Sequence, residues 1–120
     1  MSTILIAEDD SAVRSPLTVV LERRGHHVIA VGSGHECLDR LGEGEVDLVV
    51  LDVEMPSLDG WDTLSAIRES GTVPVILLTA LAGDDHRARS VERGADAFVT
   101  KPFLNRELLA IVDDLLGAAG

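Results

Sequence analysis

The chain has 120 residues, of which 46% are hydrophobic and 2% aromatic, and its formal net charge is -11. A chain of this length fits one domain with a core of its own. The acidic charge argues against a surface that binds nucleic acid through its phosphates, and so few aromatic rings cannot build a base-stacking platform.

The amino terminus has no basic region and no cleavage site, so we expect no export signal and a cytoplasmic protein. No apolar run approaches the ~20 residues of a membrane span, and we expect no contact with a membrane. Cys37 is the one cysteine of the sequence, which excludes an intramolecular disulfide and disfavours a cysteine-based metal site. We expect its thiol to be a small buried group on a helix.

Residues 3–7 form an apolar run that ends in acidic residues, which predicts a short strand buried on both faces. A helix follows, with apolar residues on one face: Val13, Leu17, Val20 and Leu21. We expect Ser11 to be its N-cap and Gly25 to end it. Pro16 falls past the first turn of such a helix, so the helix could instead begin at Ser15; the position of Val13 on the apolar face favours the early start.

The alternation of strand and helix continues to the end of the chain. Further strands are predicted at 27–31, 48–52, 75–79 and 97–100. Further helices are predicted from a capping box at Ser33 and Glu36 to Gly42–Gly44, at 61–69, from Asp84 or Asp85 to Arg93, and at 105–116. This order predicts an α/β fold with a parallel sheet, right-handed crossovers and helices on both faces. With no repeat or linker, we expect a single domain over residues 1–120, its core at about 3–116, and no output domain.

Polar side chains lie at the carboxyl ends of four of the predicted strands: Glu8, Asp9 and Asp10, then Asp52, then Thr79, and last Lys101. Because a parallel sheet brings these ends to one edge, we expect the groups to converge. Crowded carboxylates repel one another unless a cation lies between them, and Mg²⁺ suits a site of carboxylates and phosphate oxygens. In such a site Asp52 could attack a phosphoryl group, with Thr79 and Lys101 bound to the phosphoryl oxygens.

Each of these residues also has a purely structural explanation. Asp10 could be a helix cap, and Asp52 could begin a turn through its side chain. Thr79 and Lys101 carry little information when each is taken alone. The joint occurrence of these residues at four strand ends is what favours a reactive carboxylate at Asp52.

Four segments match, in order and spacing, the signature of a known family. They are Ile-Leu-Ile-Ala-Glu8-Asp9-Asp10-Ser, Val-Val-Leu-Asp52-Val-Glu-Met-Pro56-Ser-Leu-Asp-Gly60, Leu-Leu-Thr79-Ala80 and Phe98-Val-Thr-Lys101-Pro102-Phe. On these segments the chain resembles the receiver domain of two-component response regulators over nearly its whole length. The resemblance implies a flavodoxin-like, doubly wound sheet of five parallel strands in the order 2-1-3-4-5, flanked by five helices.

The resemblance also implies a metal site and a phosphoacceptor. Asp52 would accept the phosphoryl group. Asp9 would bind Mg²⁺ or Mn²⁺ directly and Glu8 mostly through water, with Asp52 and the backbone carbonyl of Glu54 as further ligands.

Three further positions take their roles from the same resemblance. Thr79 and Lys101 would bind the phosphoryl group, and the peptide bond from Lys101 to Pro102 would be cis. Phe98 stands where the family has an aromatic switch residue whose rotamer follows Thr79. The implied signal is a population shift of the surface formed by 84–93, 97–100 and 105–116.

Two positions depart from the commonest pattern of the family. Glu54 adds an acidic residue two positions after Asp52, and we expect it to slow the approach of a phosphodonor or to alter dephosphorylation. Leu81, two positions after Thr79, is apolar, and we expect it to restrict the access of water.

The resemblance implies that the chain is a signalling domain rather than a true enzyme, although it catalyses its own phosphorylation and dephosphorylation. Its expected partners are a sensor histidine kinase or phosphotransfer protein, and a downstream protein or a tethered output domain. A phosphorylation-dependent homodimer is a further expectation.

Three alternatives remain open at this point. A phosphohydrolase with Asp52 as nucleophile would need an Asp-x-Asp arrangement and a cap domain, whereas position 54 is Glu. A flavodoxin-like electron carrier would need a phosphate loop where the chain has acidic residues. The chain could also be the excised receiver of a larger DNA-binding regulator.

Overall fold

The computed structural model describes residues 2–55, 60–80 and 84–117. Within these ranges five strands alternate with five helices. The strands are β1 (Thr3–Ala7), β2 (His27–Val31), β3 (Leu48–Asp52), β4 (Val75–Thr79) and β5 (Ala97–Thr100). The helices are α1 (Ser11–Arg23), α2 (Gly34–Gly42), α3 (Gly60–Ser70), α4 (Asp84–Glu92) and α5 (Asn105–Leu115).

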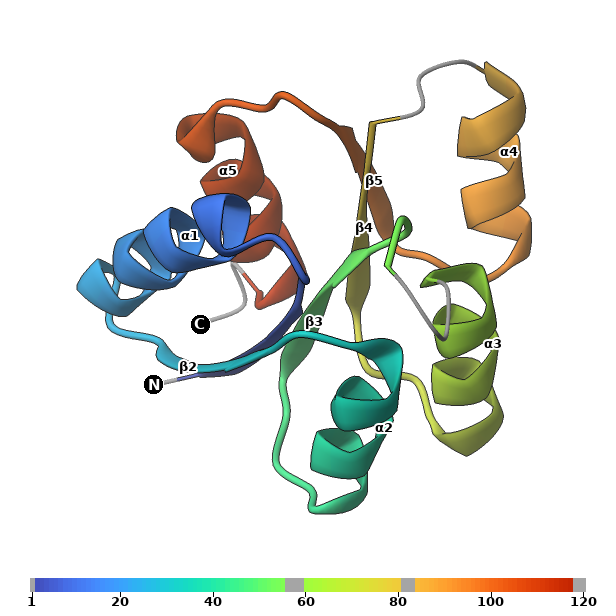
Figure 1. Cartoon of the computed structure of the whole chain (residues 1–120), viewed down its shortest axis with the longest axis horizontal. Helices are drawn as coiled ribbons and strands as arrows, with labels where there is room; N and C mark the ends of the chain where they lie inside the picture. The colour runs from blue at the N-terminus through green and yellow to red at the C-terminus, as the bar shows by residue number, and fades with distance from the viewer. Residues whose placement is uncertain (1, 56–59, 81–83, 118–120) are drawn as a thin grey trace.

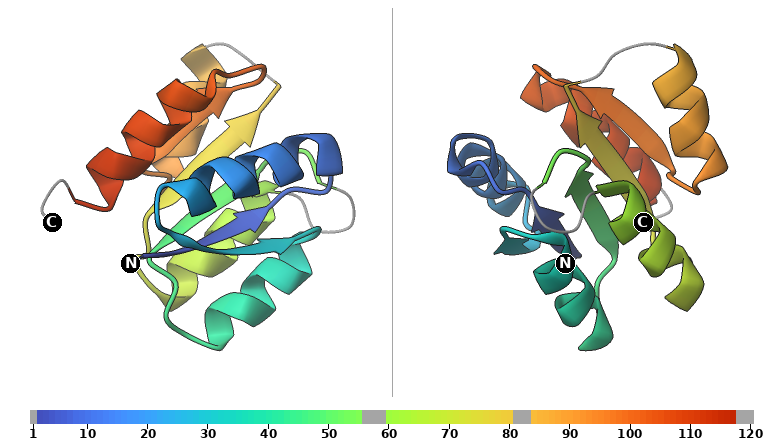
Figure 2. Two further views of the ribbon diagram at one scale, coloured as in Figure 1. Left: turned by 90° about the vertical axis from the view of Figure 1, so that its left-hand side faces the viewer. Right: turned by 45° about the vertical axis from the view of Figure 1, so that its right-hand side comes forward.

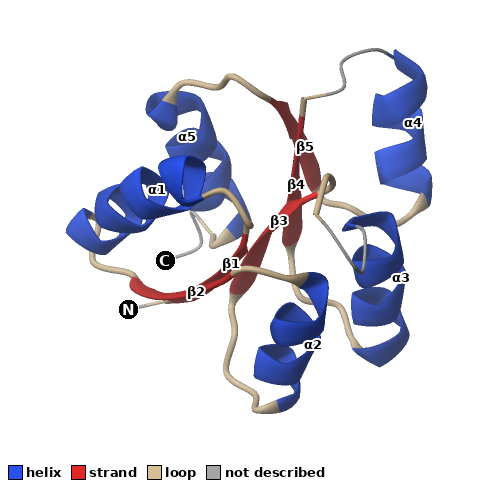
Figure 3. Ribbon diagram, in the orientation of Figure 1, coloured by secondary structure: helices blue, strands red, loops and turns tan. Residues whose placement is uncertain are grey.

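The strands form one parallel sheet in the order β2-β1-β3-β4-β5 (Figure 3). The expected flavodoxin-like, doubly wound arrangement is therefore confirmed. Helices α1 and α5 cover one face of the sheet, and α2, α3 and α4 lie on the other side (Figure 1). A second view places α1 and α5 in front of the sheet and α3 behind it (Figure 2, left).

The apolar runs in the central strands supply both faces of the core, because side chains alternate along a strand. In β3, Val49 and Leu51 join a cluster with α2 and α3 that includes Cys37, Trp61 and Ile67. Leu48 and Val50 point the other way, into a cluster with α1 and α5 that includes Leu17, Leu21, Leu108 and Val112. The unbroken apolar runs of the sequence therefore correspond to strands that pack on both sides, and Cys37 is buried as expected.

The N-cap of α1 differs from the sequence prediction by one residue. Asp10 is the cap: its backbone is extended, and its Oδ1 accepts a hydrogen bond of 2.9 Å from the Ala12 N–H. Ser11, the first predicted cap, is instead the first helical residue, and the alternative that Asp10 is the cap is confirmed. Both residue types are good caps, so residue type alone does not choose between them. The early start is correct, with Pro16 inside the helix and Gly25 beyond its end at a φ of +92°.

The start of α2 agrees with the sequence. Ser33 is the N-cap, and its hydroxyl oxygen accepts a hydrogen bond of 3.2 Å from the Glu36 N–H. The Glu36 carboxylate accepts from the Ser33 hydroxyl at 3.4 Å, rather than from the Ser33 backbone N–H as in a full capping box. The cap itself is as predicted, and the second half of the box is replaced by this side-chain contact.

The longest helix in the described ranges, α1, has 13 residues. A helix needs about 20 apolar residues to cross a bilayer. None of the helices in these ranges is long and apolar enough to do so.

Candidate functional site

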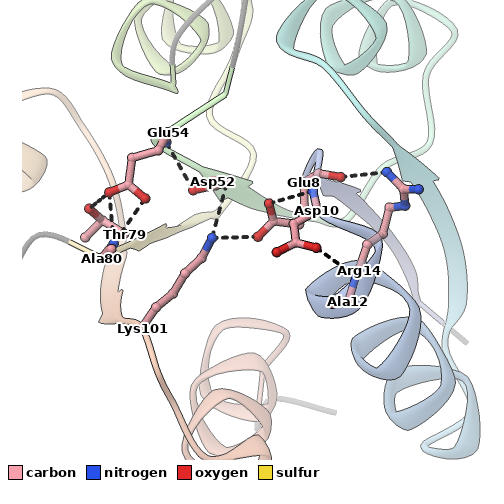
Figure 4. A network of polar contacts seen from close by, with 9 residues as sticks. All are labelled: Glu8, Asp10, Ala12, Arg14, Asp52, Glu54, Thr79, Ala80 and Lys101. Atoms are coloured by element: carbon pink, nitrogen blue, oxygen red, sulfur yellow. Dashed lines mark hydrogen bonds and ion pairs between the residues drawn. The ribbon is translucent and has the colours of Figure 1, made fainter.

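The register of the sheet places the predicted site residues at one level of its carboxyl edge. Ala7 of β1 lies beside Leu51 of β3, so the residues that follow them, Glu8 and Asp52, come to the edge together. Thr79 ends β4 beside Thr100 of β5, and Lys101 follows directly. The structure therefore brings side chains from four strands to one place (Figure 4).

Both carboxylate oxygens of Asp52 have partners, although the residue is only 1% exposed. Oδ1 accepts a hydrogen bond of 3.1 Å from the Glu54 N–H, and Oδ2 lies 3.2 Å from Nζ of Lys101. The contact with Glu54 is the side-chain turn that Asp residues commonly start. Asp52 therefore begins a turn through its side chain, and its carboxylate is also placed beside a cation as a reactive carboxylate would need.

Glu8 is a fully buried carboxylate. Its Oε2 accepts from the Asp10 N–H at 3.3 Å, and its Oε1 lies 2.8 Å from Nζ of Lys101. That second contact is an ion pair without the alignment of a good hydrogen bond. Burial, followed by the nearby Asp52 carboxylate, raises the pKa of Glu8 to about 7, and Lys101 opposes the shift.

Lys101 is the cation between these carboxylates. Burial alone lowers the pKa of its ammonium, but the close contacts with the Glu8 and Asp52 carboxylates outweigh that effect, and the net shift is upward. The peptide bond from Lys101 to Pro102 is cis.

Glu8, Asp9 and Asp52 form a donor set that fits a hard divalent cation. One carboxylate oxygen from each residue lies within 4.8 Å of the others. Asp9 is exposed while Glu8 and Asp52 are buried, so the set opens to solvent on one side. Magnesium typically binds through one or two carboxylates and keeps several waters, so this half-open carboxylate set suits it.

The side chain of Glu54 crosses from the end of β3 to the end of β4. Its Oε1 accepts hydrogen bonds from the Thr79 hydroxyl, at 2.6 Å, and from the Ala80 N–H, at 2.9 Å. Thr79 is buried, whereas Glu54 is an exposed residue. Sequence reasoning expected Glu54 near the phosphoryl site but did not identify the Ala80 N–H as a donor, since a backbone group carries no residue-type signal.

Three other positions complete the comparison with the sequence. Phe98, the predicted switch residue, lies beside Leu77 in the sheet and is partly buried against the core cluster of Trp61. Leu81, predicted to restrict water, lies outside the described residues. Arg14 was missed: its guanidinium donates a 2.8 Å hydrogen bond to the Glu8 carbonyl and holds the loop after β1 to α1.

The sequence and the structure were compared with known proteins. The family model described as "Response regulator receiver domain" matches residues 4–113. The chain is 41% identical over 116 residues to the transcriptional regulatory protein CpxR of Escherichia coli, covering 97% of this chain and 50% of CpxR. It is 40% identical over 116 residues to the transcriptional regulatory protein AfsQ1 of Streptomyces coelicolor, covering 97% of this chain and 52% of AfsQ1. The chain thus spans about half the length of these relatives.

Solved structures agree with this assignment. The receiver domain of the Francisella response regulator 1452 superposes with a TM-score of 0.93 at 30% identity, covering 97% of both chains. The BeF3-activated receiver domain of Klebsiella pneumoniae RstA superposes with a TM-score of 0.90 at 28% identity, covering 96% of this chain and 98% of the other. The family match spans most of the chain. The candidate site of the chain lies at the carboxyl edge of the sheet, where folds of this class bind their ligands. The chain belongs to the response regulator receiver domain family.

Proposed function

We propose that Asp52 accepts a phosphoryl group from a sensor histidine kinase, a phosphotransfer protein or a small phosphodonor, and that the acyl phosphate is the signalling state. The observation that carries this proposal is the position of Asp52. Its carboxylate lies 3.2 Å from the Lys101 ammonium, and one of its oxygens is within 4.8 Å of oxygens of Glu8 and Asp9. A carboxylate that contacts a cation and belongs to a metal-binding set is suited to phosphoryl transfer.

The proposed step is a substitution at phosphorus. A carboxylate oxygen of Asp52 forms a bond to phosphorus, and the bond from phosphorus to the imidazole nitrogen of the kinase, or to the acetate oxygen of acetyl phosphate, breaks. The leaving group takes the electron pair of that bond. Asp52 then carries a mixed anhydride, which water later hydrolyses to regenerate the carboxylate and free phosphate.

The residues that would hold Mg²⁺ or Mn²⁺ are Glu8, Asp9 and Asp52, with the backbone carbonyl of Glu54. The ion would supply positive charge that offsets the charge of the transferring phosphoryl oxygens. Lys101 would give a second positive charge, since its ammonium already contacts Asp52.

Thr79 would move to donate its hydroxyl hydrogen to a phosphoryl oxygen. The rotamer of Phe98 would change with the position of Thr79. The readout would be the surface formed by α4, β5 and α5, with a second copy of the chain, a target protein or a tethered output domain as its partner. Val91 on α4 is 67% exposed and Leu104, the N-cap of α5, is 52% exposed, so both are available to a partner at this surface. The relatives named as transcriptional regulatory proteins are about twice as long, which supports an output domain for such chains.

The test is incubation with acetyl phosphate and Mg²⁺, followed by intact-protein mass spectrometry. We expect the protein to gain one phosphoryl group, Asp52→Ala to gain none, and EDTA to prevent the gain. Asp39→Ala, which removes an exposed carboxylate on α2, is the matched control and should gain the group normally. A normal gain by Asp52→Ala would overturn the proposal.

A further inference from the structure

The Glu54 carboxylate accepts hydrogen bonds from two donors at the end of β4, the Thr79 hydroxyl and the Ala80 N–H. Its Oε1 accepts from the Thr79 hydroxyl at 2.6 Å and from the Ala80 N–H at 2.9 Å, and its Oε2 lies 3.2 Å from the same N–H (Figure 4). The acceptor is anionic, which strengthens these hydrogen bonds. The contact with Thr79 is short, and the Ala80 N–H is shared between the two carboxylate oxygens.

The same donors lie at the end of the strand beside the site of phosphorylation. Asp52 and Leu78 are neighbours in the sheet, so Thr79 and Ala80 follow one and two positions past the neighbour of Asp52. The Glu54 N–H donates to Asp52 Oδ1 at 3.1 Å, which holds residue 54 against the phosphoacceptor. An oxygen of a phosphoryl group on Asp52 would be, like the Glu54 carboxylate, an anionic acceptor in need of donors at this edge.

We propose that Glu54 is an internal placeholder for the phosphoryl group. In the unphosphorylated protein its carboxylate occupies the Thr79 hydroxyl and the Ala80 N–H, and it must leave them before they can bind a phosphoryl oxygen. The proposal rests on the proposed function of Asp52. In this proposal the Glu54 carboxylate competes with a phosphoryl oxygen for the same two donors. That effect differs from electrostatic repulsion of the phosphodonor by the negative charge of Glu54.

The release of Glu54 requires little rearrangement. Glu54 is exposed whereas Thr79 and Asp52 are buried, so rotation of one side chain frees the donors and returns the carboxylate to water. While no phosphoryl group is bound, the placeholder supplies an acceptor to both the Thr79 hydroxyl and the Ala80 N–H.

The probe for the competition is beryllofluoride with Mg²⁺, a phosphoryl analogue that needs no phosphodonor, with its affinity measured by calorimetry. Four proteins are compared: the parent, Glu54→Ala, Glu54→Asp and Glu54→Gln. Asp keeps the charge but is one methylene too short for the contact with Thr79, whereas Gln keeps the length and one acceptor oxygen without the charge. Glu69→Ala removes an exposed charge from α3 and controls for net charge.

The placeholder predicts that Glu54→Ala and Glu54→Asp bind beryllofluoride about tenfold more tightly than the parent, which is the effect of one charge-assisted hydrogen bond. Glu54→Gln should fall between them and the parent, and Glu69→Ala should match the parent. If Glu54→Asp matches the parent while Glu54→Gln matches Glu54→Ala, repulsion by charge is the cause and the placeholder is wrong.

A second measurement observes the contact itself. The amide proton of Ala80, hydrogen-bonded to a carboxylate, should resonate at lower field in the parent than in Glu54→Ala without any analogue present. An unchanged Ala80 resonance would contradict the placeholder even if Asp52 is phosphorylated normally. Conversely, a changed resonance and the predicted affinities, together with no phosphoryl gain from acetyl phosphate, would reject the proposed function and leave the contact standing.

Discussion

The ammonium of Lys101 lies 2.8 Å from the buried carboxylate of Glu8, although the two residues follow strands at opposite parts of the sheet. Strands β3 and β4 stand between β1 and β5. The lysine side chain therefore passes along the carboxyl edge and also reaches Asp52, at 3.2 Å. One cation thus contacts carboxylates from two strands.

Replacement of Lys101 by Met should destabilise the protein in EDTA by about 2 kcal/mol, because Glu8 and Asp52 would remain buried without a cation. Mg²⁺ should restore more stability to Lys101→Met than to the parent, because the metal would then replace the missing charge. Urea unfolding with and without Mg²⁺ measures both effects. Arg24→Met, which breaks the exposed pair with Asp113, is the control and should change stability by less than about 0.5 kcal/mol. Equal losses in the two variants would contradict the account.

The raised pKa of Glu8 predicts a dependence of stability on pH in EDTA. The pKa rises from 4.5 to about 7 on folding, so between these values the folded state holds a proton that the unfolded state has released. The contribution of Glu8 is therefore fully present below pH 4.5 and is lost as the pH rises through about 7. The free energy of unfolding of the parent should fall over this range relative to that of Glu8→Gln. Parallel curves for the two proteins would show that Glu8 does not titrate there.

Gly60, the first residue of α3, is needed for the close approach of that helix to the end of β3. A Cβ at this position would lie 2.6 Å from the Asp52 carbonyl oxygen and still closer to the Val53 Cα. Gly60→Ala should therefore cost about 1–3 kcal/mol in unfolding free energy and shift the amide resonances around Asp52. A Cβ at Gly71 would meet nothing within 4 Å, so Gly71→Ala is the control and should be nearly neutral. Equal stabilities of the two variants would refute the proposed close contact.

Cys37 should be inert in the folded protein. Burial raises the pKa of its thiol from 9.0 to about 12, and the side chain is fully inaccessible. At pH 8 the shift alone lowers the thiolate fraction about a thousandfold. A thiol-disulfide exchange reagent should therefore label Cys37 only after unfolding in urea. Labelling at the rate of a free cysteine in native buffer would contradict the burial of this residue.

The fold was predictable because each of its strands is a short run of apolar residues with helical spacing on either side. Leu48 to Leu51 and Val75 to Leu78 are continuous because both faces of the central strands are covered, as is typical of parallel sheets in α/β folds. The convergence of Glu8, Asp52 and Lys101 follows from the rule that parallel strands end at one edge. The order of these elements predicted a parallel sheet with helices on both faces, whereas the strand order 2-1-3-4-5 came from the family resemblance and the register from the structure.

Other features depend on choices that the sequence leaves open. Asp10 and Ser11 are both good N-caps, and the backbone geometry of the loop after β1 selects Asp10. Glu54 is a flexible side chain with several accessible rotamers, and its contact with Thr79 and Ala80 requires β4 to lie beside β3 in this register. Arg14 contacts a backbone carbonyl, which has no residue-type signature.

The most direct test of the central claim is to locate the phosphoryl group. After incubation with acetyl phosphate and Mg²⁺, reduction with borohydride converts a phosphorylated aspartate to homoserine, which peptide mass spectrometry assigns to a position. We predict homoserine at position 52 and nowhere else, with none when Mg²⁺ is removed. Homoserine at Asp9 or another aspartate in place of Asp52, or a phosphoryl gain that leaves Asp52 unmodified, would contradict the account.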